Sequence, residues 1–428
     1  MTRRSLWRHS NFRRLWIGQT VSEVGSTISF VAIPLVAVLT LHADAFQVGL
    51  LGTFQFLPFV LVGLPAGVWV DRLQHRAVMV VADVGRTLAL GSIPLVGAMG
   101  HLTLIQLYAV GFATGVLTVF FDVAYQSYLP TLVDRDRLVE GNSRLEFTRA
   151  TAEIAGPGIG GVLVRAVGAP VAVAADAVSY ALSVVSLVLI RGQAEPEREV
   201  RAGMLRELRE GFRYVIHQPL LRAAAGCTAS YNLVSNGISA ILVLYVVRDL
   251  GLDAPAIGLW FSLGSLTSPL GALVASRLTR RYGTGPAIII TSVAGSIAWI
   301  PVALAPRAFP LPFLVGSGLI AGPLGVGYNI VQVSMRQAIT PHRLLGRMNA
   351  TMRFFVWGTI PIGAFLGGVL GTVLGLRAAI TVFAFACLLT PLPVLLSPLR
   401  RLRDVADLVP ASDGEMALET VSPSVPAP

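Results

Sequence analysis

Two acidic side chains stand inside apolar segments that are long enough to cross a lipid bilayer. Glu23 and Asp122 have no basic residue three or four positions away, so neither can form an ion pair along its own helix. A charge at the centre of a spanning helix costs about 2.5–3.5 kcal/mol on insertion, and such residues are functional candidates. Because a carboxyl group can take up and release a proton, we expect proton transfer at both positions. A fixed hydrogen bond to a neighbouring helix is the alternative for each.

Other charges in the apolar segments come in pairs that can neutralise each other. Asp83 and Arg86 are three residues apart, and Arg149 and Glu153 are four apart, which places each pair on one helix face. For these four residues a structural ion pair is as good an interpretation as a functional one. Asp176 is a further acidic residue inside an apolar segment.

The two halves of the chain repeat each other around the unpaired acids. Glu23 aligns with Asn236 at an offset of 213 residues, and Asp122 aligns with Asn329 at an offset of 207. The first half thus presents carboxyl groups where the second presents neutral amides of similar size. We infer protonation in the first half and hydrogen bonding in the second.

Composition indicates the elements that hold these side chains. Of the 428 residues 54% are apolar and only 13% charged, whereas soluble proteins carry about 25% charged residues. A spanning helix needs about 20 apolar residues. The sequence therefore predicts an all-α integral membrane protein with twelve transmembrane helices. The expected transmembrane helices lie at about 15–40, 48–70, 77–99, 102–126, 145–166, 170–190, 222–247, 255–276, 285–304, 310–334, 349–371 and 376–397.

The basic residues exclude several function classes. All 33 are arginine, and without lysine the chain cannot form the G-x-x-x-x-G-K-[ST] loop that binds nucleotide phosphates. The arginines stand in short loops and not on one folded face, so we expect no nucleic-acid partner. Cys227 and Cys387 lie in apolar segments and the six histidines are scattered, so we expect no disulfide, metal, cofactor or enzymatic activity.

Arginine also predicts orientation and domain organisation. Clusters of arginine alternate along the chain with connections that hold one each, and the positive-inside rule places the clusters and both termini in the cytoplasm of a bacterial plasma membrane. In the linker, Phe212 and Val215 continue a helical spacing that predicts a short amphipathic helix at the inner membrane surface. The predicted parts are a cytoplasmic N-terminus (1–14), a six-helix bundle (15–190), a cytoplasmic linker (191–221), a second six-helix bundle (222–397) and a disordered cytoplasmic tail (398–428).

Two motifs carry a family resemblance. Residues 67–76 read G-V-W-V-D-R-L-Q-H-R, similar to the loop motif G-x-L-A-D-R-x-G-R, and residues 155–161 read A-G-P-G-I-G-G, similar to the antiporter element G-P-x-x-G-G. The chain therefore resembles the major facilitator superfamily, in its twelve-span drug:proton antiporter branch with macrolide and enterobactin-type exporters. It departs from that branch at two places: span 4 lacks an embedded arginine, and Ser276 stands where the second loop motif would have an aspartate.

The resemblance implies gating roles for residues of both motifs. The loop motif would act as a latch that is made in one conformation and broken in the other, the alternative being a plain topological stop. The second motif would form a rocking interface, the alternative being ordinary helix packing. The implied gating residues are Gly67, Asp71, Arg72, Arg76, Gly156, Pro157, Gly160 and Gly161.

The resemblance also implies the major facilitator fold of two six-helix bundles, in which spans 1, 4, 7 and 10 line a central cavity. Glu23 and Asp122 would face it, and nearby polar side chains would supply the few directional contacts of a mainly apolar site. These side chains are Gln19, Tyr125, Gln126, Asn232, Asn236, Tyr328, Asn329 and Gln332.

The sequence as a whole predicts a secondary active transporter. We expect proton-coupled efflux of an amphipathic small molecule, such as an antibiotic, a toxic metabolite or a siderophore, by alternating access of two bundles around a midplane site. A solute importer of the same fold and a non-transporting membrane sensor or scaffold are the alternatives. The expected partners are the small-molecule substrate, protons and the lipid bilayer, and the expected oligomeric state is a monomer.

Overall fold

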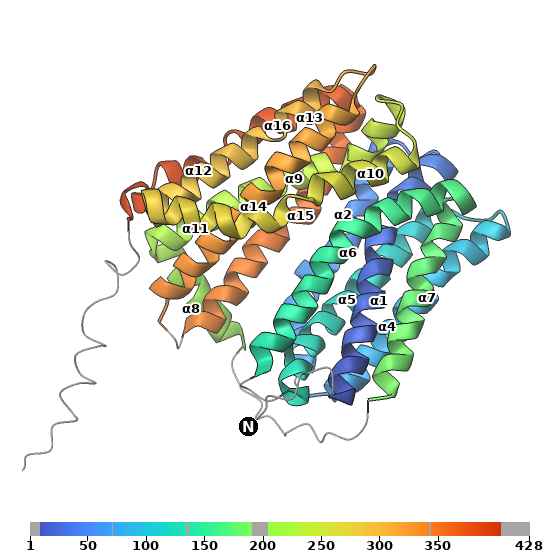
Figure 1. Cartoon of the computed structure of the whole chain (residues 1–428), viewed down its shortest axis with the longest axis horizontal. Coiled ribbons are helices and arrows are strands. Elements are labelled where there is room, and N and C mark those ends of the chain that lie inside the picture. The colour runs from blue at the N-terminus through green and yellow to red at the C-terminus, as the bar shows by residue number, and fades with distance from the viewer. Residues whose placement is uncertain (1–8, 71, 134–136, 191–203, 342–343, 404–428) are drawn as a thin grey trace, which may run out of the picture.

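The computed structural model describes residues 9–70, 72–133, 137–190, 204–341 and 344–403, and all regular structure within them is helical (Figure 1). Four predicted features fall wholly or partly outside the described residues. These are the N-terminus, of which only 9–14 is described, the disordered tail, of which only 398–403 is described, the first part of the linker (191–203) and the acidic position Asp71 of the loop motif.

The first bundle holds the helices that precede the linker. They are α1 (Ser10–Leu35) with a π-helical turn (Val36–Thr40), α2 (Ala45–Leu61), α3 (Gly63–Val70), α4 (His75–Ala98), α5 (Leu104–Leu132), α6 (Leu138–Val167) and α7 (Ala169–Val188). α1 packs on α6 and α7, and α4 packs on α5 and α7.

The second bundle follows the linker helix α8 (Met204–His217). Its helices are α9 (Pro219–Arg248), α10 (Ala254–Ser265), a 3₁₀ turn (Ser268–Leu270), α11 (Gly271–Tyr282), α12 (Thr284–Ile297), α13 (Ile300–Leu304), α14 (Leu311–Ile339), α15 (Leu345–Leu374), α16 (Leu376–Cys387), α17 (Leu392–Leu395) and a final 3₁₀ turn (Pro398–Arg401). α9 packs on α15 and α16, and α14 packs on α10, α11 and α12.

The predicted all-helical membrane fold is confirmed. Ten of the twelve predicted spans correspond to helical stretches in the described residues that are long and apolar enough to cross a membrane. The other two spans are α2 continued by α3, which a break at Val62 separates, and α6, whose first half is rich in charge. Several helices continue past the apolar core that the sequence marks: α5 runs to Leu132 and α6 starts at Leu138. Helical hydrogen bonding does not need apolar side chains, so these helices extend beyond their apolar segments and the predicted spans are too short at these ends.

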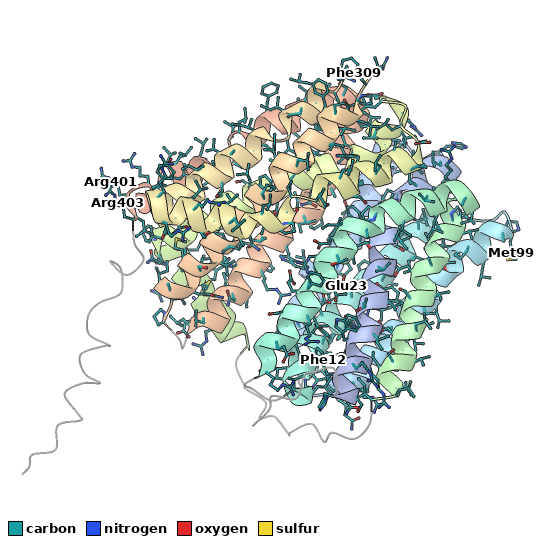
Figure 2. The ribbon with its side chains drawn as sticks, viewed as in Figure 1. Phe12, Glu23, Met99, Phe309, Arg401 and Arg403 are labelled. Carbon is teal, nitrogen blue, oxygen red and sulfur yellow. The ribbon has the colours of Figure 1, made fainter. Side chains whose placement is uncertain are left out.

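The two bundles meet at one end and diverge towards the other (Figure 1). We call the first the closed end; it carries the connections 41–44 and 249–253. The opposite end, at which α1 begins and α8 lies, is the open end. Phe12 of the first bundle and Arg401 and Arg403 of the second mark the separated open ends in Figure 2. Among the described arginines, the clustered Arg401 and Arg403 lie at the open end (Figure 2), whereas the single Arg165 and Arg248 lie at the closed end.

The distribution of the hydrophobic core explains this shape. At the closed end one buried cluster includes side chains of both bundles, among them Val36 of the first and Tyr245 of the second. Towards the open end each bundle has its own cluster, around Met79 in the first and around Met335 in the second. Burial of apolar surface therefore joins the bundles at the closed end.

Glycines let the backbones touch at the closed end. A Cβ added to Gly49 of α2 would lie 2.5 Å from the Cα of Gly368 on α15. On the other side of the interface, a Cβ on Gly161 of α6 would lie 2.3 Å from the carbonyl oxygen of Ala254 at the start of α10. Small residues at helix crossings allow such close approach in membrane proteins.

α8 packs against the second bundle and is linked to it by polar contacts. The Glu210 carboxylate forms an ion pair with Arg347 at the start of α15, and the Tyr214 hydroxyl donates to the Ile339 carbonyl over 3.1 Å. Val215 is buried against the same bundle, and Phe212 faces the Phe355 ring at 5.2 Å. α8 thus caps the open end of the second bundle.

Substitution of Gly49 by alanine is expected to open the closed end. The added methyl group meets the α15 backbone, and such overpacking costs about 1–3 kcal/mol. Spin labels on the exposed connections at His101→Cys and Arg307→Cys should then show a longer distance population in double electron–electron resonance. Gly316→Ala on α14 is the matched control, because its Cβ would meet no atom within 4 Å. Identical distance distributions for Gly49→Ala and the control would contradict the interpretation.

Candidate functional site

Three cavities lie along the facing surfaces of the bundles, and each holds a different one of the acids Glu23, Asp122 and Asp176. We name them the Glu23, Asp122 and Asp176 cavities. The Glu23 cavity, between α1, α5 and α6, has a volume of about 460 Å³. Its lining residues are Gln19, Glu23, Tyr125, Asn142, Ser143, Leu145, Glu146, Thr148 and Arg149. Figure 2 places Glu23 along the first bundle, between the level of Phe12 and the closed end.

Arg149 dominates the charge of the Glu23 cavity. It forms ion pairs with Glu146 and with Glu153, so the predicted Arg149–Glu153 pair is present and has a third member. All three side chains are half exposed. With Arg149 engaged in this way, Glu23 has no ion-pair partner among the described residues.

The Asp122 cavity is small, about 130 Å³, and lies where α2, α3 and α5 of the first bundle face α15 of the second. Asp122 and Arg353 both line it, one from each bundle. The guanidinium carbon of Arg353 lies 5.6 Å from the Trp357 ring centroid, and that ring lies 4.7 Å from the ring of Phe59. A carboxylate and a guanidinium therefore face each other across the bundle interface.

The Asp176 cavity is the one most evenly shared between the bundles. It has a volume of about 420 Å³ and draws on α1, α2, α4, α5 and α7 as well as α9, α10 and α15. Asn236 of the second bundle lines it together with Asp176 and Tyr180 of the first. Across the cavity, the Phe30 and Phe261 rings meet edge to face with centroids 5.6 Å apart. Its size suits a small-molecule ligand.

A buried polar network lies behind the Asp176 cavity. Arg86 forms the predicted ion pair with Asp83, and its guanidinium carbon lies 4.3 Å from the Phe121 ring and 4.2 Å from the Tyr180 ring. The Tyr180 hydroxyl and the Ser26 hydroxyl share a hydrogen bond of 2.8 Å. Asp83, Arg86 and Asp176 are all almost fully buried. The ion pair and the two aromatic faces offset part of the cost of placing Arg86 in the interior.

The structure separates the polar side chains that the sequence grouped around one cavity. Gln19 and Tyr125 lie with Glu23, and Asn236 lies with Asp176. The Asn232 amide donates to the Val356 carbonyl over 3.1 Å, which joins α9 to α15 within the second bundle. A helix pattern gives the position of a side chain along its helix but not the cavity that it faces.

The remaining members of that group lie elsewhere. The Tyr328 hydroxyl shares a 2.8 Å hydrogen bond with Thr228 and lines a cavity of about 40 Å³ inside the second bundle. Gln332 is buried, and its amide Nε2 donates to the side-chain Oδ1 of Asn329 over 3.2 Å. Asn329 and Gln126 have exposed side chains.

The loop motif contacts its own bundle in this conformation. Arg76 donates to the Leu187 and Val188 carbonyls at the end of α7, over 2.8 and 2.6 Å. Arg72 is exposed, and a Cβ on Gly67 would meet no atom within 4 Å.

The second motif serves two interfaces. A Cβ on Gly156 would lie 1.8 Å from the Thr27 hydroxyl, and one on Gly160 would lie 3.2 Å from Ile28, so these glycines fit α6 against α1 of the same bundle. Pro157 and Gly161 face the second bundle: a Cβ on Gly258 of α10 would lie 2.4 Å from the Pro157 carbonyl oxygen.

Polar contacts that the sequence analysis missed hold the closed end. Arg248 of α9 donates to the carbonyls of His42 and Ala43 over 3.1 and 2.9 Å, and Arg165 of α6 pairs with Asp253 over 3.1 Å. His42 has a positive φ of 54°, unusual for a residue other than glycine. In the sequence, the single arginines of these connections indicate only the orientation of the chain. Their partners lie too far along the chain for a local pattern to predict these contacts.

Comparison with known families decides the identity of this arrangement. The family model described as transmembrane secretion effector matches residues 3–423. The chain belongs to this family. It is a membrane transporter of the major facilitator superfamily and not an enzyme, as the sequence predicts.

Relatives of this transmembrane secretion effector are exporters by name. The multidrug efflux pump Tap of Mycolicibacterium fortuitum is 27% identical over 401 residues, which cover 89% of this chain and 94% of the relative. The enterobactin exporter EntS of Escherichia coli O157:H7 is 25% identical over 412 residues, covering 95% and 96%. The predicted efflux class is confirmed at this level.

Solved structures share the fold. A bacterial homologue of the iron transporter ferroportin in its inward-facing state gives a TM-score of 0.74 at 19% identity, covering 92% of this chain and 99% of that one. The outward-facing state of such a homologue gives 0.57 at 18% identity, covering 90% and 98%. Both comparisons show that this chain shares the fold of these transporters.

Removal of the Arg248 side chain is expected to loosen the closed end of this secretion effector. Arg248→Ala deletes two hydrogen bonds that join the bundles, one exposed to solvent and one partly buried, and the partly buried one contributes at most the value of a hydrogen bond to a charged group, about 1.5–3 kcal/mol. Hydrogen–deuterium exchange should rise in the peptides that contain His42 and Ala43. Arg165→Ala is expected to change exchange much less, because exposed ion pairs contribute about 0–1 kcal/mol. Equal exchange in Arg248→Ala and the wild type would show that these bonds do not hold the closed end.

Proposed function

We propose that this efflux transporter is a proton-coupled exporter that carries amphipathic small molecules out of the bacterial cytoplasm by alternating access. The observation that carries the proposal is the joining of the bundles at one end, around a 420 Å³ cavity lined by both. Rocking about such a joint exposes the cavity to one side at a time. The printed names of the relatives, a multidrug efflux pump and an enterobactin exporter, support export.

Orientation follows from arginine. The clusters lie at the open end, so the positive-inside rule puts that end, and with it both termini, in the cytoplasm. The structure then corresponds to a state that loads cargo from inside the cell. The proposed oligomeric state is a monomer, because one chain contains the whole cavity.

Asp122 supports a direct link between protonation and bundle movement. Its carboxylate faces Arg353 of the opposite bundle across the Asp122 cavity. An ionised Asp122 attracts Arg353 and draws the bundles together at this place, whereas a protonated Asp122 loses that attraction. Proton binding can thereby change the relative energies of two bundle arrangements.

Glu23 is the second proposed proton carrier. It lines a cavity of about 460 Å³ on the first bundle, next to the Glu146–Arg149–Glu153 cluster. A proton on Glu23 changes the charge of this cavity without breaking either ion pair of Arg149. The loop motif (Gly67, Asp71, Arg72, Arg76) and the glycines of α6 remain the proposed gating elements.

Neutral replacements of the two acids are expected to uncouple transport. Glu23→Gln and Asp122→Asn should insert and fold, because an amide of the same size replaces each carboxyl group. Proteoliposomes with a trapped pH-sensitive dye should then show loss of solute-driven proton flux. Asp249→Asn, which removes an acid outside all three cavities, is the control for the change of charge. Wild-type proton flux in both Glu23→Gln and Asp122→Asn would refute proton coupling through these residues.

A double-mutant cycle tests the facing charges of the Asp122 cavity. If Asp122 acts through Arg353, then Asp122→Asn, Arg353→Gln and the double variant should slow transport to a similar extent, with a coupling energy of about 0.5–3 kcal/mol. Arg353→Lys keeps the charge and is expected to retain most of the rate. Additive losses would mean that the two side chains act separately.

A further inference from the structure

We propose that the Asp176 cavity recognises lipophilic monovalent cations, with Asp176 as the residue that selects positive charge. The proposal rests on the proposed function as an exporter and names the class of cargo that the central site takes. It begins from the charge of the cavity. Among the described residues that line it, Asp176 alone carries a charged side chain.

Asp176 is buried and has local polar support. Asp176 is only 2% exposed. The Ser179 hydroxyl lies 3.2 Å from the Oδ1 oxygen of its carboxylate. That hydroxyl also lies 2.8 Å from the Asp176 carbonyl oxygen, one turn back on α7. These contacts orient the carboxylate but bring no positive charge.

The neighbouring arginine is shared between two acids. Arg86 forms its ion pair with Asp83, and the Phe121 and Tyr180 rings cover its guanidinium group on two sides, while its charge also acts on Asp176. One guanidinium group can balance only one of the two carboxylates, so an ionised Asp176 leaves one net negative charge at the cavity. An uncompensated charge in a low-dielectric interior is costly, and a bound monocation offsets it.

The rest of the cavity suits the apolar part of such a ligand. Phe30, Phe56, Phe59 and Phe261 line it, and aromatic faces attract cations as well as apolar groups. Ser26, Gln55 and Asn236 add polar groups that can orient a ligand. Phe30 and Phe261 come from opposite bundles, so one bound molecule touches both.

The other two cavities do not offer the same charge pattern. In the Glu23 cavity the lining includes Arg149, and in the Asp122 cavity it includes Arg353. A cation entering either cavity meets a guanidinium group, although the Glu23 cavity keeps a net negative charge because Glu23 and Glu146 both line it beside Arg149. The Asp176 cavity combines a buried carboxylate, aromatic surface and no arginine in its described lining, which makes it the site for a cation.

Tetraphenylphosphonium and tetraphenylborate test this assignment, because the two ions have nearly the same size and shape and carry opposite charge. Equilibrium dialysis of the purified full-length protein in detergent should show at least about tenfold tighter binding of tetraphenylphosphonium, a difference of about 1.4 kcal/mol. Asp176→Asn should lower the affinity for tetraphenylphosphonium about tenfold or more and abolish the preference. Asp176→Glu keeps the charge and should retain the preference, while Asp249→Asn controls for the loss of an acid elsewhere.

Each result decides the proposal. Equal affinity of the wild type for both ions, or unchanged tetraphenylphosphonium binding in Asp176→Asn alongside intact binding in Asp249→Asn, overturns it. If Asp176→Asn fails to fold, loss of the preference in Asp176→Glu, with its charge retained, also overturns the assignment. Binding without a membrane is independent of transport. A wild type that discriminates the two ions but moves no solute in proteoliposomes would refute the exporter and leave the cation site standing.

Discussion

Backbone contact at the closed end is the interaction on which the rest of the structure depends. Gly49 meets Gly368 on one side of the interface, and Gly161 meets Ala254 on the other. Helices can approach this closely only where side chains are absent, and each crossing lies beside a core cluster that spans both bundles. Because the bundles are joined there and diverge elsewhere, their facing surfaces leave room for three cavities with distinct chemistry.

The two bundles differ in the polar groups that they bury. The buried charges Asp83, Arg86 and Asp176 all belong to the first bundle, while the second presents amides and hydroxyl groups such as Asn236 and Tyr328. The internal repeat predicts part of this asymmetry, since Glu23 aligns with Asn236. The structure adds that Glu23, Asp122 and Asp176 occupy separate cavities, so the proposed proton transfer and the proposed cargo recognition use different carboxyl groups of one bundle.

Features set by local spacing could be predicted from the sequence. The spans follow from runs of apolar residues, and the Asp83–Arg86 and Arg149–Glu153 pairs follow from helical periodicity. The cavity that each side chain faces could not be predicted, because it depends on the rotation of each helix against neighbours far along the chain. Asn232, for example, is expected at the central cavity, but its amide donates to the Val356 carbonyl on α15 within its own bundle. Contacts such as Arg248 with His42, separated by 206 residues, have no local signal at all.

The backbone at His42 has an energetic consequence for the cycle. A non-glycine residue in the left-handed region stores about 1–3 kcal/mol of strain, and here the carbonyl of that residue accepts a hydrogen bond from Arg248 of the opposite bundle. Any arrangement that moves α9 away from the connection between α1 and α2 breaks this bond. If His42 then leaves the left-handed region, the strain that is released offsets part of the free energy lost with the bond.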